Sequence, residues 1–80
     1  MVREIVQASR RTGERVRYLL EVFAEGDHYT STLAKLDERG EAVEERVAPR
    51  FYGITSEQAR RRMITILEND YDEIAVVPHE

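Results

Sequence analysis

The sequence contains no cysteine, so neither disulfide bonds nor thiolate metal sites can stabilise the fold. This absence fits a reducing compartment. Long apolar runs are also missing, because the longest covers only the four residues from Ile74 to Val77. A membrane-spanning helix needs about 20 consecutive apolar residues. The N-terminus lacks the charged and then apolar pattern of a signal peptide, and we therefore expect a cytoplasmic protein.

Sequence motifs of enzymes are missing as well. There is no G-x-S-x-G, H-E-x-x-H, P-loop or G-x-G-x-x-G pattern. The two histidines, His28 and His79, have no matched partner for catalysis or metal binding. Carboxylates cluster between Asp70 and Glu73, but this segment lacks the glycine and the distal glutamate of a helix-loop-helix calcium site. We therefore expect a non-enzymatic protein that uses no metal and no cofactor.

Lysine is nearly absent, because Lys35 is the only one and the other 11 of the 12 basic residues are arginine. The net charge is -4, and the segment from Glu68 onward carries five acidic and no basic residues. This balance argues weakly against nucleic-acid binding. A chain of 80 residues suits one domain, which buries only about 60 to 65 per cent of its unfolded surface. Such a marginal core benefits from good packing or from oligomerisation.

The segment from Arg15 to Glu25 has the clearest pattern in the chain. Apolar side chains occupy every second position from Val16 to Ala24, and the alternate positions are mostly charged. A period of two residues indicates a strand with one buried face. The frequent β-branched and aromatic residues also favour a strand over a helix. We therefore expect this segment to be the central strand of a sheet.

Three more segments predict strands, at Val2–Arg11, Tyr29–Leu36 and Glu41–Tyr52, with imperfect alternation in the first. Short turn sequences separate the four strands, which predicts consecutive hairpins. The turn sequences are Thr12-Gly13-Glu14, Gly26-Asp27 and Asp37-Glu38-Arg39-Gly40.

The two prolines bound the pairing of strands. Proline cannot donate a hydrogen bond to a neighbouring strand, so Pro49 either makes its strand an edge or ends the pairing there. Pro78 bounds the apolar run Ile74–Val77. This run is either a short fifth strand or an apolar tail laid over the core, and the sequence leaves both alternatives open.

A helix is predicted to begin at Thr55, where Thr55-Ser56-Glu57-Gln58 fits a capping box. Gly53 is expected to free the backbone to turn before it. Asn69 is expected to end the helix in a left-handed conformation. The apolar positions keep the spacing of three and four that makes one stripe, with Ile64 at its margin. These positions are Ala59, Met63, Ile66, Leu67 and Tyr71.

These elements predict an α+β fold in which one helix packs on one face of a four-stranded antiparallel meander, with a possible short fifth strand. A helix of 15 residues is about 22 Å long and covers one face of the sheet but not both. The predicted core consists of Val16, Tyr18, Leu20, Val22, Ala59, Met63, Ile66 and Leu67.

The uncovered sheet face is predicted to be a protein interface. Leu19 and Phe23 lie on the charged side of the central strand, with Arg17 beside them and either Leu33 or Leu36 nearby. An apolar cluster on an open sheet face is typical of an interface. We therefore expect a protein-interaction or regulatory module that homodimerises through this face and that can also bind an unidentified protein partner.

Single-stranded nucleic-acid binding is the alternative function. Arginines interleaved with aromatic residues on an open sheet can neutralise phosphates and stack bases. Glutamates on the same strand faces favour the simpler interpretation of cross-strand ion pairs. The residues of this alternative site are Arg15, Arg17, Phe23, Arg46, Arg50 and Tyr52.

The segment from Gly53 to Ala59, in which a strand ends in glycine and a capped helix follows, resembles the sheet-to-helix junction of the HicB-like antitoxin domains. The match covers less than a quarter of the chain, and the upstream strands lack the compact glycine-rich second strand of that family. The resemblance implies a regulatory protein that forms dimers.

Overall fold

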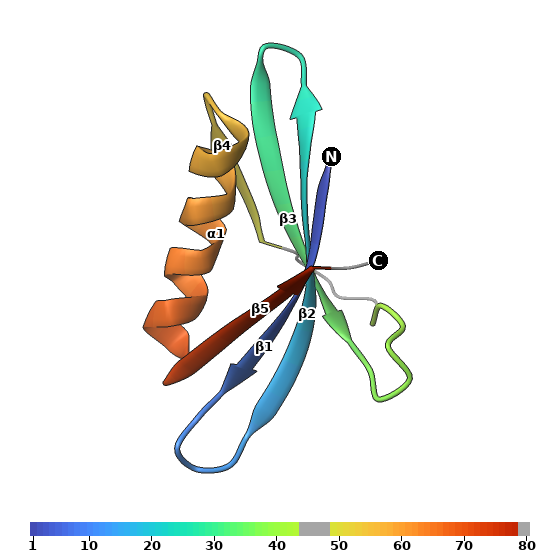
Figure 1. Ribbon diagram of the computed structural model, residues 1–80, viewed down its shortest axis with the longest axis vertical. Coiled ribbons are helices and arrows are strands. Elements are labelled where there is room, and N and C mark those ends of the chain that lie inside the picture. The colour runs from blue at the N-terminus through green and yellow to red at the C-terminus, as the bar shows by residue number, and fades with distance from the viewer. Residues whose placement is uncertain (44–48, 79–80) are drawn as a thin grey trace.

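A computed structural model describes residues 1–43 and 49–78 of the chain. These residues form one five-stranded antiparallel sheet with a helix packed across one face, which confirms the predicted α+β fold (Figure 1). The strands lie in the order β4-β3-β2-β1-β5. The elements are β1 (Val2–Ser9), β2 (Arg15–Glu25), β3 (His28–Leu36), β4 (Arg50–Gly53), α1 (Ser56–Asp70) and β5 (Glu73–Pro78).

Strand β2 is the central strand, as its alternation predicts, and pairs along its length with β1 and β3. Val22 lies opposite Val2, and Leu20 lies between Glu4 and Leu33. The turn into β3 has only two residues, and its Gly26 has a φ of 65°, which matches the first central position of a type II′ turn.

The run that the sequence left undecided is a strand. β5 pairs antiparallel with β1, from Pro78 opposite Glu4 to Glu73 opposite Ser9. The entry to this strand is fixed by the Asp72 N–H, which donates to the Ser9 carbonyl at 2.9 Å. Residues 68–78 of the acidic C-terminal end are therefore built into the last turn of α1 and an edge of the sheet.

The fourth strand is much shorter than the predicted segment from Glu41 to Tyr52. β4 begins at Arg50, and before residue 44 only Ala42 pairs with β3, through a single bridge to Leu36. The rest of that prediction, at residues 44–48, lies outside the described residues. β4 is an edge strand that begins directly after Pro49, as proline requires.

Helix α1 begins as predicted and ends differently. The Thr55 hydroxyl accepts from the Gln58 N–H at 3.1 Å, and the Gln58 side chain reaches back to accept from the Ile54 N–H at 2.7 Å. The prediction of a left-handed end at Asn69 is wrong, because the helix continues to Asp70. Tyr71 then leaves it in an extended conformation, and its N–H donates to the Leu67 carbonyl. α1 is neither long nor apolar enough to cross a membrane.

The core lies between α1 and the sheet and contains most of the predicted residues. The prediction is wrong for Ile66, whose side chain is 40 % exposed while Ile64 is buried, and Val16 also lies outside the buried core. The helix is rotated so that Arg60 and Ile64, on the other flank of the stripe, turn toward the sheet. Tyr18 packs against the core but is only partly buried, and so is Val16. The buried apolar residues are Val6, Ala8, Leu20, Val22, Leu33, Ala59, Met63, Ile64 and Leu67.

Polar contacts also fix the helix over the sheet. Arg60 forms a two-pronged ion pair with Glu4 of β1, at 2.6 and 3.2 Å. This hydrogen bonding raises the pKa of Arg60 above its ordinary value, so the guanidinium stays charged at any practical pH. On β3, the fully buried Ser31 hydroxyl donates to the Ala59 carbonyl at 2.7 Å. The helix is therefore held by specific polar contacts in addition to apolar packing.

Candidate protein interface on the uncovered sheet face

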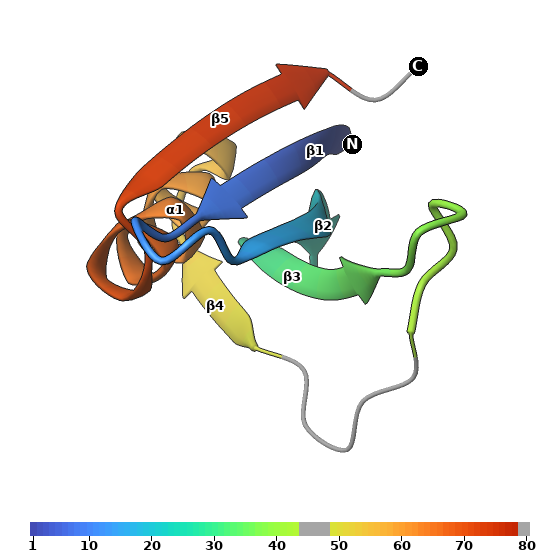
Figure 2. The same cartoon turned by 90° about the horizontal axis from the view of Figure 1, so that it is seen from below.

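The sheet face opposite α1 carries no helix among the described residues (Figure 2). Because side chains alternate along strands, this face is formed by every second residue of each strand. On β2 these are the six residues Arg15, Arg17, Leu19, Glu21, Phe23 and Glu25. We call this surface the uncovered face.

An apolar row crosses the middle of the uncovered face, perpendicular to the strands. Leu19 of β2 lies directly between Ile5 of β1 and Ala34 of β3, and Ile5 in turn lies beside Val77 of β5. Three residues of this row are partly buried by their neighbours, namely Leu19, Ile5 and Ala34, whereas Val77 is 48 % exposed. The row therefore presents a continuous apolar strip across four strands to solvent.

A charged row runs beside this strip. Arg3 of β1 donates to the Glu21 carboxylate of β2 at 2.9 Å, and the same row continues through Thr32 to Arg50. Arg50 lies 3.8 Å from the Glu25 carboxylate. Both of these arginines thus already have a carboxylate partner, as cross-strand ion pairing predicts.

The far end of the face beyond the charged row, which we call the aromatic end, carries Phe23 and Tyr52 on either side of Thr30. Thr30 is fully buried although it points away from the helix, and its hydroxyl donates to Glu25 at 3.0 Å. The His28 ring packs edge-on against Tyr52, with 5.3 Å between ring centres. The hydrogen bond of Thr30 and the ring contact of His28 with Tyr52 thus order the side chains at this end of the face.

The opposite end of the face, which we call the arginine end, carries Arg15, Arg17 and Leu36 around an open hollow of about 810 Å³. The loop after β3 leaves the sheet on the side away from α1 and forms one wall of this hollow (Figures 1 and 2). Arg17 reaches the carbonyls of Asp37 and Glu38 at 3.4 Å each, which are long and weak hydrogen bonds.

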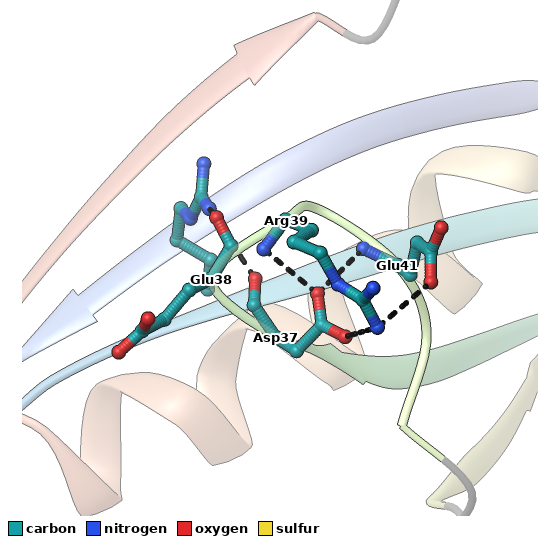
Figure 3. Close-up of polar contacts among 5 residues, drawn as sticks. Asp37, Glu38, Arg39 and Glu41 are labelled. Atoms are coloured by element: carbon teal, nitrogen blue, oxygen red, sulfur yellow. Dashed lines mark hydrogen bonds and ion pairs between the residues drawn. The ribbon is translucent and has the colours of Figure 1, made fainter.

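The loop wall is held in shape by its own polar contacts (Figure 3). The Asp37 carboxylate accepts from the N–H groups of Arg39 and Glu41, at 2.9 and 3.0 Å. The Arg39 guanidinium lies 3.8 Å from Asp37 and 3.5 Å from Glu41. The hollow is therefore bordered by an ordered turn with acidic side chains.

The structure places the predicted site residues of the described chain on this one face. Leu19, Phe23, Arg15 and Arg17 come from β2, and Arg50 and Tyr52 come from β4. Arg46 lies outside the described residues. Of the two leucines left open, Leu36 is on this face and Leu33 is in the core.

Sequence reasoning missed Val77, because its place depends on the pairing of β5 with β1. It also did not join Ile5 to Leu19, because the pattern of the first strand alone does not give its register with the central strand. The hairpin register makes Ile5 and Leu19 direct neighbours.

Comparisons of the chain with models of protein families, with curated proteins and with solved structures find no match. The resemblance to the HicB-like antitoxin domains therefore depends on the junction between β4 and α1 alone.

Proposed function

We propose that this protein is a non-enzymatic interaction module that forms a homodimer through the uncovered face. The apolar row of Val77, Ile5, Leu19 and Ala34 is the observation that carries the proposal. Contiguous apolar surface on a sheet is typical of an interface. The absence of cysteine suits a reducing compartment, and we place the protein in the cytoplasm.

A second copy of the chain is the partner that this face suits. The uncovered face carries positive and negative side chains, so that two copies can place opposite charges against each other. Dimerisation would also add burial to a small core. Completing the burial of a large apolar side chain contributes about 1 to 2 kcal/mol, and each residue of the row counts twice in a symmetric dimer.

Replacing the central residue of the row tests the proposal. Leu19→Glu would place two carboxylates in the middle of the interface, and we expect this variant to be monomeric by light scattering after size exclusion. Ile66→Glu is the matched control, because Ile66 is an exposed apolar residue on the helix, away from the uncovered face. The control should remain dimeric. Equal masses for the two variants would contradict the proposal.

Single-stranded nucleic-acid binding is the competing outcome for the same face. Phe23 and Tyr52 could stack bases, but Arg50 already has a carboxylate partner, and the face carries Glu21 and Glu25. A titration with a mixed-sequence oligonucleotide at low salt distinguishes the two functions. Saturable binding that weakens steeply with added salt would favour nucleic acid, because neutralised phosphates release counterions. We expect no such binding.

A further inference from the structure

The charged side chains of β2 that lie on the uncovered face differ in sign on the two sides of Leu19. Two residues before it is Arg17, and two residues after it is Glu21. Each of these positions lies about 7 Å from Leu19 along the strand. Four residues away lie Arg15 on one side and Phe23 on the other. The strand therefore has a positive half and a half that is acidic and aromatic, with the apolar row between them.

We propose that the two copies of the dimer pack with their β2 strands antiparallel, so that Arg17 of each copy pairs with Glu21 of the other. This inference rests on the proposed function. The two-fold axis runs along the apolar row, and each residue of that row then faces its own counterpart. The Phe23 side chain of each copy then lies over the hollow at the arginine end of the other.

The alternative two-fold axis, which runs along β2, is disfavoured by charge. It would place Arg17 against Arg17, Arg15 against Arg15 and Glu21 against Glu21 of the second copy. Like charges in direct opposition are destabilising, whereas complementary charges fix the orientation of an interface. In the antiparallel arrangement the residues opposite Arg3 and Leu36 are Gln7 and Thr32, so no like charges meet on β1, β2 or β3.

The existing contacts of the two charged residues leave room for this pairing. Arg3 uses only one oxygen of the Glu21 carboxylate, and a carboxylate can accept from more than one guanidinium. Within residues 1–43 and 49–78, Arg17 makes only the two long hydrogen bonds to loop carbonyls. Packed sheets are rotated by about 30° in aligned packing, and pairs only two residues from the axis remain within reach of an arginine side chain.

Charge reversal tests the arrangement by sedimentation equilibrium. In the Arg17→Glu dimer, residue 17 of each copy faces Glu21 of the other, so that two carboxylates meet at both contacts. In the Glu21→Arg dimer, two guanidinium groups meet at both contacts. We expect each single variant to dimerise at least about tenfold more weakly than the wild type, which corresponds to about 1.4 kcal/mol. The double variant Arg17→Glu/Glu21→Arg restores opposite charges at both contacts and should recover the wild-type dissociation constant.

An equimolar mixture of the two single variants provides a control for folding. Each copy in the mixed dimer then supplies the charge that the other lacks, so the mixture should dimerise although neither variant does so well alone. A misfolded variant could not give this result. A wild-type dimer that neither single variant weakens, or that the double variant does not recover, overturns the arrangement and leaves the homodimer in place. A monomeric wild type overturns both.

Discussion

Gly53 is the residue at which the smallest side-chain change should have a large effect. A Cβ atom at this position would lie 2.6 Å from the Ala59 nitrogen and 3.0 Å from the Gln58 Cβ. The helix cannot move away without losing its contact with β4, so we expect Gly53→Ala to lower the free energy of unfolding by about 2 kcal/mol. Urea denaturation measures this loss.

Gly40→Asn is the matched control for Gly53→Ala. Gly40 has a φ of 83° and open space around it, and asparagine tolerates positive φ. Its substitution should cost less than about 1 kcal/mol. Equal losses for the two variants would contradict the account, because Gly53 has no positive φ and only close packing requires glycine at this position.

The ion pair of Glu4 and Arg60 gives a second prediction for single residues. Both side chains are mostly buried, so Glu4→Gln leaves a guanidinium without its charge partner beneath the helix. We expect a loss of about 1 to 2 kcal/mol, less than for a fully buried pair because water still reaches the site. The double variant Glu4→Leu/Arg60→Leu should recover most of this stability in the same denaturation experiment. A double variant less stable than Glu4→Gln would contradict this account.

Single residues were predictable where a local rule applies and unpredictable where a distant contact decides. Capping chemistry identified Thr55, because the group it satisfies is three residues away. Glycine at position 53 was expected for a turn, whereas its requirement comes from the approach of the helix backbone. The sequence ranked Ile66 above Ile64 as a core residue, and this was wrong, because the rotation of α1 depends on contacts with β1 that lie 56 residues away in the chain.

Helix α1 depends on its first turn, and the chain provides a matched pair of threonines to test this. Thr55→Ala removes the hydroxyl that accepts from the Gln58 N–H, and should cost about 1 kcal/mol. Thr65→Ala changes an exposed residue within the helix and should be neutral or slightly stabilising, because alanine has the higher helix propensity. Thermal unfolding followed by circular dichroism compares them. A neutral Thr55→Ala would show that the cap does not stabilise the helix.

Among the elements, the period of two residues was sufficient for β2 and the period of 3.6 for α1. Neither period could identify β5, since a run of four apolar residues carries no periodicity. The predicted fourth strand began too early, because the alternation starts at Glu41, whereas β4 begins at Arg50 and only Ala42 pairs with β3 before residue 44. Sequence periodicity reports which residues could share a face, and pairing partners decide how far a strand extends.

For the whole molecule, the alternation in β2 alone placed Leu19 and Phe23 on a face that one helix cannot cover. The apolar row was not predictable as a unit, because it joins four strands through three registers and ends at Val77 on the strand that the sequence left undecided. The structure thus extends a pair of apolar residues into a strip across the sheet.

Sedimentation equilibrium of the wild-type protein, from low to high micromolar concentration, tests most directly whether the uncovered face is an interface. The account predicts that the average mass rises with concentration from the chain mass of 9.3 kDa toward twice that value, and no further. A mass that stays at 9.3 kDa up to high micromolar concentration would contradict the account.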